Sequence, residues 1–212
     1  MFIIDGPAEL RGEISVQGAK NSTLPLLSAA LLCKGQTVLH NCPELSDVNI
    51  AVKILEHLGC RCRREGHDLI VDSAITSCEI PEDLMRGMRS SIVFLGAMAA
   101  RCGRARLCSP GGCELGPRPI DLHLSSLRRL GVEIDESGGW LTCTAPQGIQ
   151  GAYVSLAFPS VGATENLILA AVCAKGTTII ANAAREPEIC DLCEYLNRCG
   201  GRVYGAGESC LI

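Results

Sequence analysis

The chain has 212 residues, of which 47% are hydrophobic, and this is enough to build a substantial core, so a disordered or collagen-like chain is excluded. Its 19 Lys and Arg residues are outnumbered by 23 Asp and Glu residues, which gives a net charge of −4 without charged blocks, and only 3% of the residues are aromatic. A chain with this charge and so few aromatic rings is not expected to bind nucleic acid.

The N-terminal segment is not typical of a secretory signal, because no basic residues precede its apolar run and that run ends at Asp5. The longest strongly apolar run, residues 92–100, is too short to cross a bilayer. We therefore expect a cytoplasmic protein without a membrane partner.

The chain contains 14 cysteines, but disulfide scaffolds are typically short secreted chains with poor cores, and this chain has neither property. Most of the thiols, such as Cys33 and Cys173, lie in apolar runs where a free cysteine packs as a small hydrophobic residue. Only Cys190 and Cys193 have the spacing of a zinc knuckle, and their segment is predicted to be helical. We expect no metal site and no cofactor.

A pattern of helices that end at glycine recurs three times along the chain. Gly35, Gly103 and Gly176 follow apolar helices at spacings of 68 and 73 residues. A second set follows amphipathic helices at spacings of 72 and 69 residues: Gly59, Gly131 and Gly200. Two independent sets of glycines therefore indicate a structural repeat of about seventy residues.

Each unit is predicted to contain the same elements in the same order. Those of the first unit are a strand over 13–16, a helix over 22–34, a strand over 37–41, a helix over 48–58 and a hairpin over 60–63 and 69–71. Those of the second are a helix over 88–102, a strand over 105–108, a helix over 122–130 and a hairpin over 132–134 and 140–142. Those of the third are a helix over 163–175, a strand over 177–182, a helix over 189–199 and a hairpin over 202–204 and 210–212.

The first helix of each unit is apolar on all sides, which predicts a buried position, whereas the second has a polar side that faces solvent. The chain is therefore predicted to be an α/β protein of three βαβαββ units around a pseudo-threefold axis, with helices inside and small sheets outside. The units cover about 13–77, 78–150 and 151–212, and no linker separates them into two domains.

The loops that enter the three central helices differ between the units, which makes them candidates for function. Helix N-termini offer unpaired N–H groups to an anion, and Lys20 and Arg89 add full positive charges to two of these loops. The alternative is ordinary N-capping by Asn21, Ser90 and Thr164.

The loop over 109–123 is longer than its counterparts in the other units. Gly111 and Gly112 permit a tight turn that exposes Cys113, the one cysteine outside an apolar run. A thiol near Arg118 and His123 ionises more easily, which favours acid–base or nucleophilic chemistry.

Five motifs resemble those of the UDP-N-acetylglucosamine enolpyruvyl transferases, also called 1-carboxyvinyltransferases. They occur in that family's order: Gly18-Ala-Lys-Asn21, Pro110-Gly-Gly-Cys113, Gly116-Pro-Arg-Pro-Ile-Asp-Leu-His123, Ser160-Val-Gly-Ala-Thr164 and Ala183-Ala-Arg-Glu-Pro-Glu188. The resemblance implies a transferase that moves enolpyruvate from phosphoenolpyruvate to the 3-hydroxyl of UDP-N-acetylglucosamine. This is the first committed step of bacterial peptidoglycan synthesis, and hence of cell wall biogenesis, cell shape and cell division. It also implies the inside-out α/β fold that the repeat predicts.

The resemblance assigns a role to each matching residue. Cys113 corresponds to the catalytic cysteine, a general acid toward the enolpyruvyl methylene that the epoxide antibiotic fosfomycin alkylates. Phosphoenolpyruvate contacts are implied for Lys20, Asn21 and Arg118. UDP-sugar contacts are implied for Arg89, Arg118, Pro119, Ile120, Asp121, Leu122, His123, Ser160, Val161 and Gly162. Phe158 departs from relatives that carry a lysine there.

Family members are about twice as long as this chain and have two such domains around a cleft. The resemblance therefore implies an N-terminal part of the enzyme, inactive alone because the aspartate that takes the sugar proton lies in the other half. It also implies that the arm over 1–17 belongs to that other domain, so that in this chain the arm is expected to be either poorly ordered or paired with a second copy. The remaining alternatives are the shikimate-pathway relative and a non-catalytic binding or metal module.

Overall fold

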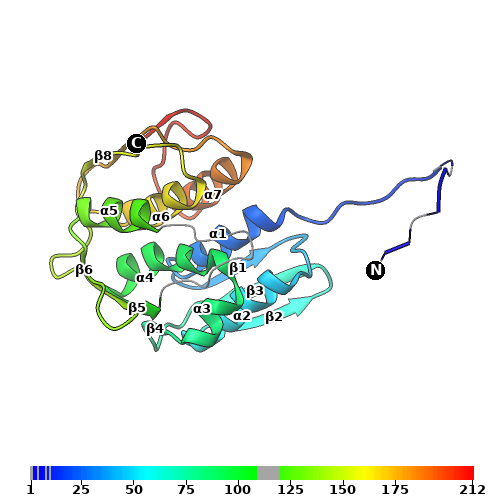
Figure 1. Cartoon of the computed structure of the whole chain (residues 1–212), viewed down its shortest axis with the longest axis horizontal. Helices are drawn as coiled ribbons and strands as arrows, with labels where there is room; N and C mark the ends of the chain where they lie inside the picture. Colours follow the sequence, from blue (N-terminus) through cyan, green and yellow to red (C-terminus); the bar gives the residue numbers. More distant parts are fainter. Residues whose placement is uncertain (1, 4, 8, 10, 109–119) are drawn as a thin grey trace.

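The computed structural model describes the whole chain except residues 1, 4, 8, 10 and 109–119 (Figure 1). Its helices are α1 (Lys20–Ala30), α2 (Ser46–His57), α3 (Glu82–Gly87), the 3₁₀ helix η1 (Arg89–Val93), α4 (Phe94–Cys102), α5 (Asp121–Arg129), α6 (Val161–Ala171) and α7 (Pro187–Arg198). Its strands are β1 (Gln36–Leu39), β2 (Arg61–Glu65), β3 (Asp68–Asp72), β4 (Glu79–Ile80), β5 (Arg104–Cys108), β6 (Glu133–Asp135), β7 (Trp140–Thr144), β8 (Tyr153–Ser155), β9 (Ile179–Ala181) and β10 (Cys210–Leu211).

Three small sheets repeat one strand order. The second unit has the order β4-β5-β7-β6, in which β4 runs parallel to β5 and the other pairs are antiparallel. In the first unit, the order β1-β3-β2 corresponds to β5-β7-β6 of the second unit. In the third unit, the order β8-β9-β10 corresponds to β4-β5-β7. The α/β fold of three related units that the sequence predicts is therefore confirmed.

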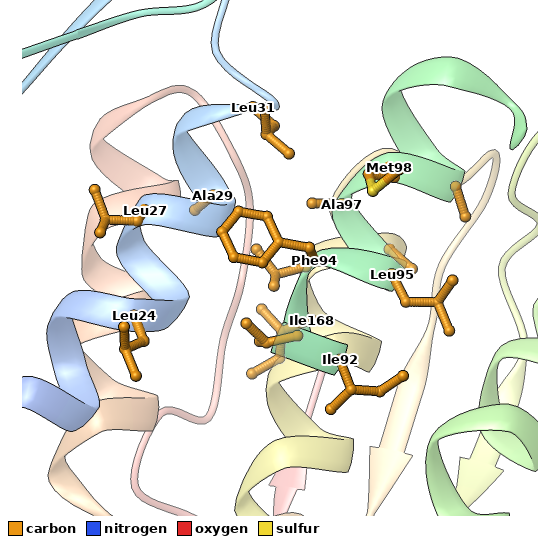
Figure 2. Close-up of a cluster of buried hydrophobic side chains, with 14 of the residues drawn as sticks. Leu24, Leu27, Ala29, Leu31, Ile92, Phe94, Leu95, Ala97, Met98 and Ile168 are labelled. Carbon is orange, nitrogen blue, oxygen red and sulfur yellow. The ribbon is translucent and has the colours of Figure 1, made fainter. Parts of the chain in front are cut away.

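The helices α1, α4 and α6 occupy the centre, as their apolar sequences predict. Figure 1 shows them between the sheets, and Figure 2 shows Phe94 lying between the Leu27 side of α1 and Ile168 of α6. Phe94 and Leu27 are completely buried. Burial of each such side chain contributes about 1.5–3 kcal/mol relative to exposure, so this contact between units is a main source of stability.

Two predicted elements differ in detail from the structure. The single helix predicted over 88–102 is divided into η1 and α4, and Ser91 inside η1 donates a hydrogen bond to the Met85 carbonyl at 3.0 Å. The strand predicted over 202–204 is not formed as such, although Tyr204 and Ile212 exchange two backbone hydrogen bonds. The first strands of the second and third units, β4 and β8, are expected from the βαβαββ pattern, but their bounds were not predicted, and α3 was not predicted at all, because two to six residues carry too little periodicity.

The strand predicted over 13–16 is wrong for this structure. The described residues before Lys20 form no strand, and the segment extends away from the three units (Figure 1). The physical reason is that residues 13–16 do not pair: β4 and β8 pair with β5 and β9, whereas the described residues place no strand on the corresponding edge of β1, so the segment lacks the backbone hydrogen bonds that stabilise a strand. That the arm belongs to a second domain or another copy stays a prediction.

The arm is expected to mediate self-association, because Phe2 and Ile14 are 99% and 91% exposed and unpaired strand edges attract partners. Light scattering after gel filtration should give a mass above one chain for residues 1–212 at high concentration, and a single-chain mass after deletion of residues 2–16. Equal masses for the two proteins would contradict this role.

Candidate functional site

The N-terminal ends of several helices meet in one region of the molecule. The Asn21 amide of α1 lies 3.5 Å from Glu188 of α7, and the Ala184 N–H before α7 donates to Thr164 of α6 at 3.1 Å. Asn166 of α6 bonds in turn to His123 of α5 and to the Ile92 carbonyl of η1. The loops that enter all three central helices are therefore linked through hydrogen bonds.

Lys20 lies at the first position of α1 and is held by a carboxylate of the neighbouring helix. Its Nζ lies 2.8 Å from Asp47 Oδ2 on α2, with the lysine side chain 46% exposed. The next turn is bound to α7, where the Ser22 hydroxyl donates to Asp191 at 2.5 Å. An exposed ion pair of this kind contributes at most about 1 kcal/mol to stability, so its main effect is to position the ammonium group beside the helix end.

The capping alternative for these loops is wrong at the residues named. The residue before α1 is Ala19, which makes no side-chain cap, and Asn21 lies inside the helix with its amide directed to Glu188. Ser90 lies inside η1, and Thr164 is buried in α6. α6 is capped instead by Ser160, whose hydroxyl accepts from the Ala163 N–H at 3.4 Å. The first N–H groups of α1 therefore have no side-chain cap and remain available to an anion.

His123 is a neutral imidazole fixed by Asn166. Burial lowers the pKa of His123 to about 4, which outweighs the opposite effect of Asp121. The Asn166 amide oxygen accepts from the Gly96 N–H at 2.7 Å, so its nitrogen must donate, to the Ile92 carbonyl at 2.9 Å and to His123 Nδ1 at 2.7 Å. His123 therefore carries its proton on Nε2.

The Nε2 side of His123 faces the loop that enters α6. A Cβ atom at Gly162 would lie 3.0 Å from His123 Cε1 and 3.3 Å from Nε2, so the glycine leaves the space that the ring occupies. His123 is 8% exposed, with the N–H on the side of Ser160–Gly162. The resemblance placed both segments in one subsite, and they do lie together.

Glu165 is a second buried titratable group in the first turns of α6. It is 8% exposed, and burial together with the nearby charge of Glu188 raises its pKa to about 8. Sequence reasoning gave no role to Glu165, Asn166, Asp47 and Asp191, and it included Glu188 only as the end of a motif. The sequence feature that could have identified these residues is their polar character near the start of the helices over 46–57, 161–171 and 187–198.

Arg89 begins η1 and is half-buried. Its Nη2 atom is buried and has no hydrogen-bond partner among the described residues. A buried guanidinium nitrogen without an acceptor costs free energy, so a bound acceptor oxygen would be favourable there. The remaining arginine expected at the site, Arg118, lies outside the described residues, as do Cys113 and Pro119.

The other expected contacts lie at the start of α5 and α6. Ile120 is half-buried directly before α5, Asp121 is exposed at its first position and Leu122 follows half-buried. Val161 is the half-buried first residue of α6. Phe158 is 59% exposed three residues before α6, where it supplies no charge.

An open groove of about 420 Å³ runs beside the α1 entrance, between β1 and α7. Ser22, Val38 and Tyr195 are among its lining residues, but Arg89 and His123 are not. In the described part of the chain, no group of three or more His, Cys, Asp or Glu side chains is arranged to hold a metal ion. None of the described helices has the length and apolar character needed to cross a membrane.

Comparison with protein families identifies the family of this chain. The sequence pattern of the EPSP synthase (3-phosphoshikimate 1-carboxyvinyltransferase) family matches residues 4–212. The chain belongs to this family. The match covers all three units, so the family assignment and the repeat describe the same residues.

Curated relatives support the resemblance to the UDP-N-acetylglucosamine enzymes. UDP-N-acetylglucosamine 1-carboxyvinyltransferase 2 of Caldanaerobacter subterraneus subsp. tengcongensis is 50% identical over 212 residues, which are 100% of this chain and 51% of the relative. UDP-N-acetylglucosamine 1-carboxyvinyltransferase 1 of Symbiobacterium thermophilum is 47% identical over 97% of this chain and 48% of the relative. The chain thus spans about half the length of the curated relatives it matches.

Solved structures show the same fold at lower identity. The enolpyruvyl transferase NikO from Streptomyces tendae has a TM-score of 0.83 at 23% identity, over 97% of this chain and 48% of NikO. EPSP synthase from Acinetobacter baumannii has a TM-score of 0.73 at 19% identity, over 94% of this chain and 46% of that enzyme. At these identities the likeness concerns the fold alone.

Proposed function

We propose that this chain forms part of a UDP-N-acetylglucosamine 1-carboxyvinyltransferase of peptidoglycan synthesis, a cytoplasmic enzyme. The observation that carries the proposal is 50% identity along the entire chain to a relative of that name, together with the five motifs. In the reaction, the 3-hydroxyl oxygen of the sugar forms a bond to C2 of phosphoenolpyruvate and loses its proton. A proton adds to the methylene carbon C3 in the same addition. The methyl group so formed then loses one proton as the bond between C2 and the phosphate oxygen breaks, which restores the C2–C3 double bond and releases inorganic phosphate.

Lys20 and Asn21 bind phosphoenolpyruvate in this proposal. Both lie in the first turn of α1, where uncapped N–H groups and the positive end of the helix dipole favour a phosphate. Asp47 holds the Lys20 ammonium at 2.8 Å and fixes its position before substrate arrives. A phosphate that draws Lys20 away from Asp47 gains a charge-assisted hydrogen bond.

The UDP-sugar lies along the starts of α5 and α6. Ser160, Val161 and Gly162 present the N-terminal N–H groups of α6 to the diphosphate, and His123 adds one further donor at Nε2. Ile120, Asp121 and Leu122 provide the wall and polar contacts for the uridine. Arg89 supplies its unpaired guanidinium nitrogen to an oxygen of the ligand.

Cys113, Arg118 and Pro119 complete the site in the proposal. Cys113 delivers a proton to the methylene carbon of the enolpyruvyl group, and Arg118 contacts both substrates, as the family resemblance implies. The proton-accepting aspartate of the family is outside these 212 residues. Ligand binding, rather than turnover, is therefore the measurement that tests this chain.

UDP-N-acetylglucosamine at millimolar concentration is expected to raise the melting temperature of the chain, whereas shikimate 3-phosphate is not. A ligand at 100 times its dissociation constant stabilises by about 2.7 kcal/mol, which is measurable by differential scanning fluorimetry. Arg89→Ala should abolish the shift, and Arg128→Ala, which removes an arginine paired with Glu136 outside the site, should preserve it. A shift with shikimate 3-phosphate alone would assign the shikimate-pathway reaction instead, and no shift with either ligand would favour a non-catalytic module.

Cys113 is expected to be the first thiol alkylated by limiting iodoacetamide at pH 7. Burial raises the pKa of competing thiols, to about 12 at Cys62 and about 11 at Cys143 and Cys193, so these are protonated and slow to react. Peptide mapping identifies the modified residue, with Cys113→Ser as the control. Faster modification of Cys60, Cys62 or Cys143 would refute activation of Cys113 within this chain.

A further inference from the structure

Two cysteines from the first and third units lie side by side where helices α1 and α7 end. Cys33 follows α1 and Cys199 directly follows α7, and their Sγ atoms are 3.5 Å apart although 166 residues separate them in sequence. Lys20 marks the opposite end of α1. This pair is therefore separate from the candidate transferase site.

A hydroxyl chain leads to Cys33. The Tyr195 hydroxyl lies 3.2 Å from Cys33 Sγ, and Thr37 Oγ1 lies 2.9 Å from the same hydroxyl. When Thr37 donates to Tyr195, the tyrosine proton is directed to the sulfur of Cys33. A Cys33 thiolate would thus accept hydrogen bonds from Tyr195 and from the Cys199 thiol, which stabilises its negative charge.

The two thiols differ in the role that their surroundings favour. Cys199 is exposed, and Cys33 is half-buried. Burial and the hydrogen bond to Cys33 raise the pKa of Cys199, whereas the hydroxyl chain through Tyr195 ends at the sulfur of Cys33. This division gives an attacking sulfur at Cys33 and a resolving sulfur at Cys199.

We propose that Cys33 and Cys199 form a thiol–disulfide exchange site whose substrate is a low-molecular-weight disulfide. The Cys33 thiolate attacks one sulfur of the disulfide, which forms a mixed disulfide and releases one small thiolate. Cys199 then loses its proton and attacks Cys33 Sγ, which forms the Cys33–Cys199 bond and releases the second small thiolate. The two protein thiols are oxidised by two electrons in total, the small disulfide is reduced to two thiols, and the two protons pass to those thiols.

A second close thiol pair provides an internal comparison. Cys78 and Cys102 are hydrogen-bonded to each other, and burial together with Cys78 raises the pKa of Cys102 to about 12. No tyrosine or threonine hydroxyl is hydrogen-bonded to this pair in the described part of the chain. Oxidation of Cys33 and Cys199 should therefore precede oxidation of Cys78 and Cys102.

The test is oxidation of the purified protein with glutathione disulfide at pH 8, followed by blocking of free thiols and tryptic mapping without reductant. Cleavage after Lys20, Lys34, Arg198 and Arg202 releases Cys33 on residues 21–34 and Cys199 on residues 199–202. We expect a cross-linked pair of these two peptides, which dithiothreitol abolishes. Cys199→Ser should leave glutathione attached to Cys33, and Tyr195→Phe should slow cross-linking about 3- to 10-fold, as expected for loss of one hydrogen bond.

Other patterns of oxidation would overturn the proposal. A Cys78–Cys102 cross-link that appears first, or a link from Cys33 to Cys173 in place of Cys199, would remove the site. Unchanged kinetics in Tyr195→Phe, with an unchanged circular dichroism spectrum, would refute the role of the hydroxyl. Peptide mapping of the unsubstituted protein decides the proposal even if a variant fails to fold.

Discussion

Replacing Gly96 by alanine is expected to lower the melting temperature by about 10 °C or more. A Cβ atom at Gly96 would lie 2.3 Å from the backbone oxygen of Asn166 and 2.8 Å from its Oδ1 atom. The first neighbour is main chain, so α4 and α6 must separate to relieve the clash. Overpacking costs about 1–3 kcal/mol, and disruption of the buried hydrogen bond from Gly96 to Asn166 adds about 1–3 kcal/mol.

A matched glycine in the same unit provides the control for this substitution. At Gly87 a Cβ atom would meet only the side chain of Ile50, 3.3 Å away at its nearest atom, and this side chain can adjust. Gly87→Ala should therefore change the melting temperature by only a few degrees, measured by circular dichroism or calorimetry. Similar melting temperatures for the two variants would mean that α4 and α6 do not approach through Gly96.

The repeat could be found from the sequence because its signal is backbone geometry. The six glycines that defined the units all have positive φ values: Gly35 at 133°, Gly59 at 107°, Gly103 at 67°, Gly131 at 84°, Gly176 at 94° and Gly200 at 96°. Residues other than glycine rarely adopt this conformation, so each unit keeps the glycine where its helices end. The steric limits on the backbone therefore place a glycine at the ends of the same two helices in each of the three units.

The partners within the candidate site could not be found in this way. Asn166 contacts His123 across 43 residues and Gly96 across 70, and nothing local in the sequence encodes either contact. Lys20 and His123 stood out in the sequence as charged or titratable residues in helix-entry loops, and the resemblance gave them roles, but only the fold showed which residues surround them. For residues 13–16 a local signal is present but the contact is missing. Their alternating pattern predicts a strand, yet no strand of the described chain pairs with them.

The stability of the protein is expected to fall as pH rises from 6.5 to 8, and Glu165→Gln is expected to remove this fall. The folded protein keeps a proton on Glu165 up to a pKa of about 8, whereas the unfolded chain loses it near 4.5. Between these values the folded state binds more protons, so higher pH favours unfolding. One pKa unit corresponds to about 1.4 kcal/mol, which gives about 2 kcal/mol between pH 6.5 and 8.

His123 acts in the opposite direction, over a lower pH range. Its pKa falls from 6.5 in the unfolded chain to about 4 in the folded protein, so the unfolded state binds more protons between these values. The titration of His123 therefore lowers the free energy of unfolding as pH falls below 6.5. The effects of Glu165 and His123 on stability partly cancel between pH 4.5 and 6.5. Above pH 6.5, the change in stability therefore comes from Glu165.

Urea unfolding at half-unit pH steps from 6.5 to 8 measures how the unfolding free energy changes with pH in the unsubstituted protein and in Glu165→Gln. Unfolding free energies of the Gln variant should be nearly constant over this range, and should lie above those of the unsubstituted protein at pH 8. Glu133→Gln, at an exposed position on β6, serves as the control and should retain the fall. A fall that persists in Glu165→Gln would show that Glu165 is already ionised at neutral pH.

The same substitution separates stability from ligand binding at pH 7. Glutamine has nearly the shape of a protonated glutamate and no charge, so it reproduces the neutral state in which Glu165 stands beside Glu188 at this pH. An ionised Glu165 would add a negative charge in the first turns of α6, where the proposed diphosphate of the UDP-sugar binds. The Gln variant should therefore bind UDP-N-acetylglucosamine as the unsubstituted protein does at pH 7, and more tightly at pH 8.5, where only the unsubstituted protein acquires the additional charge.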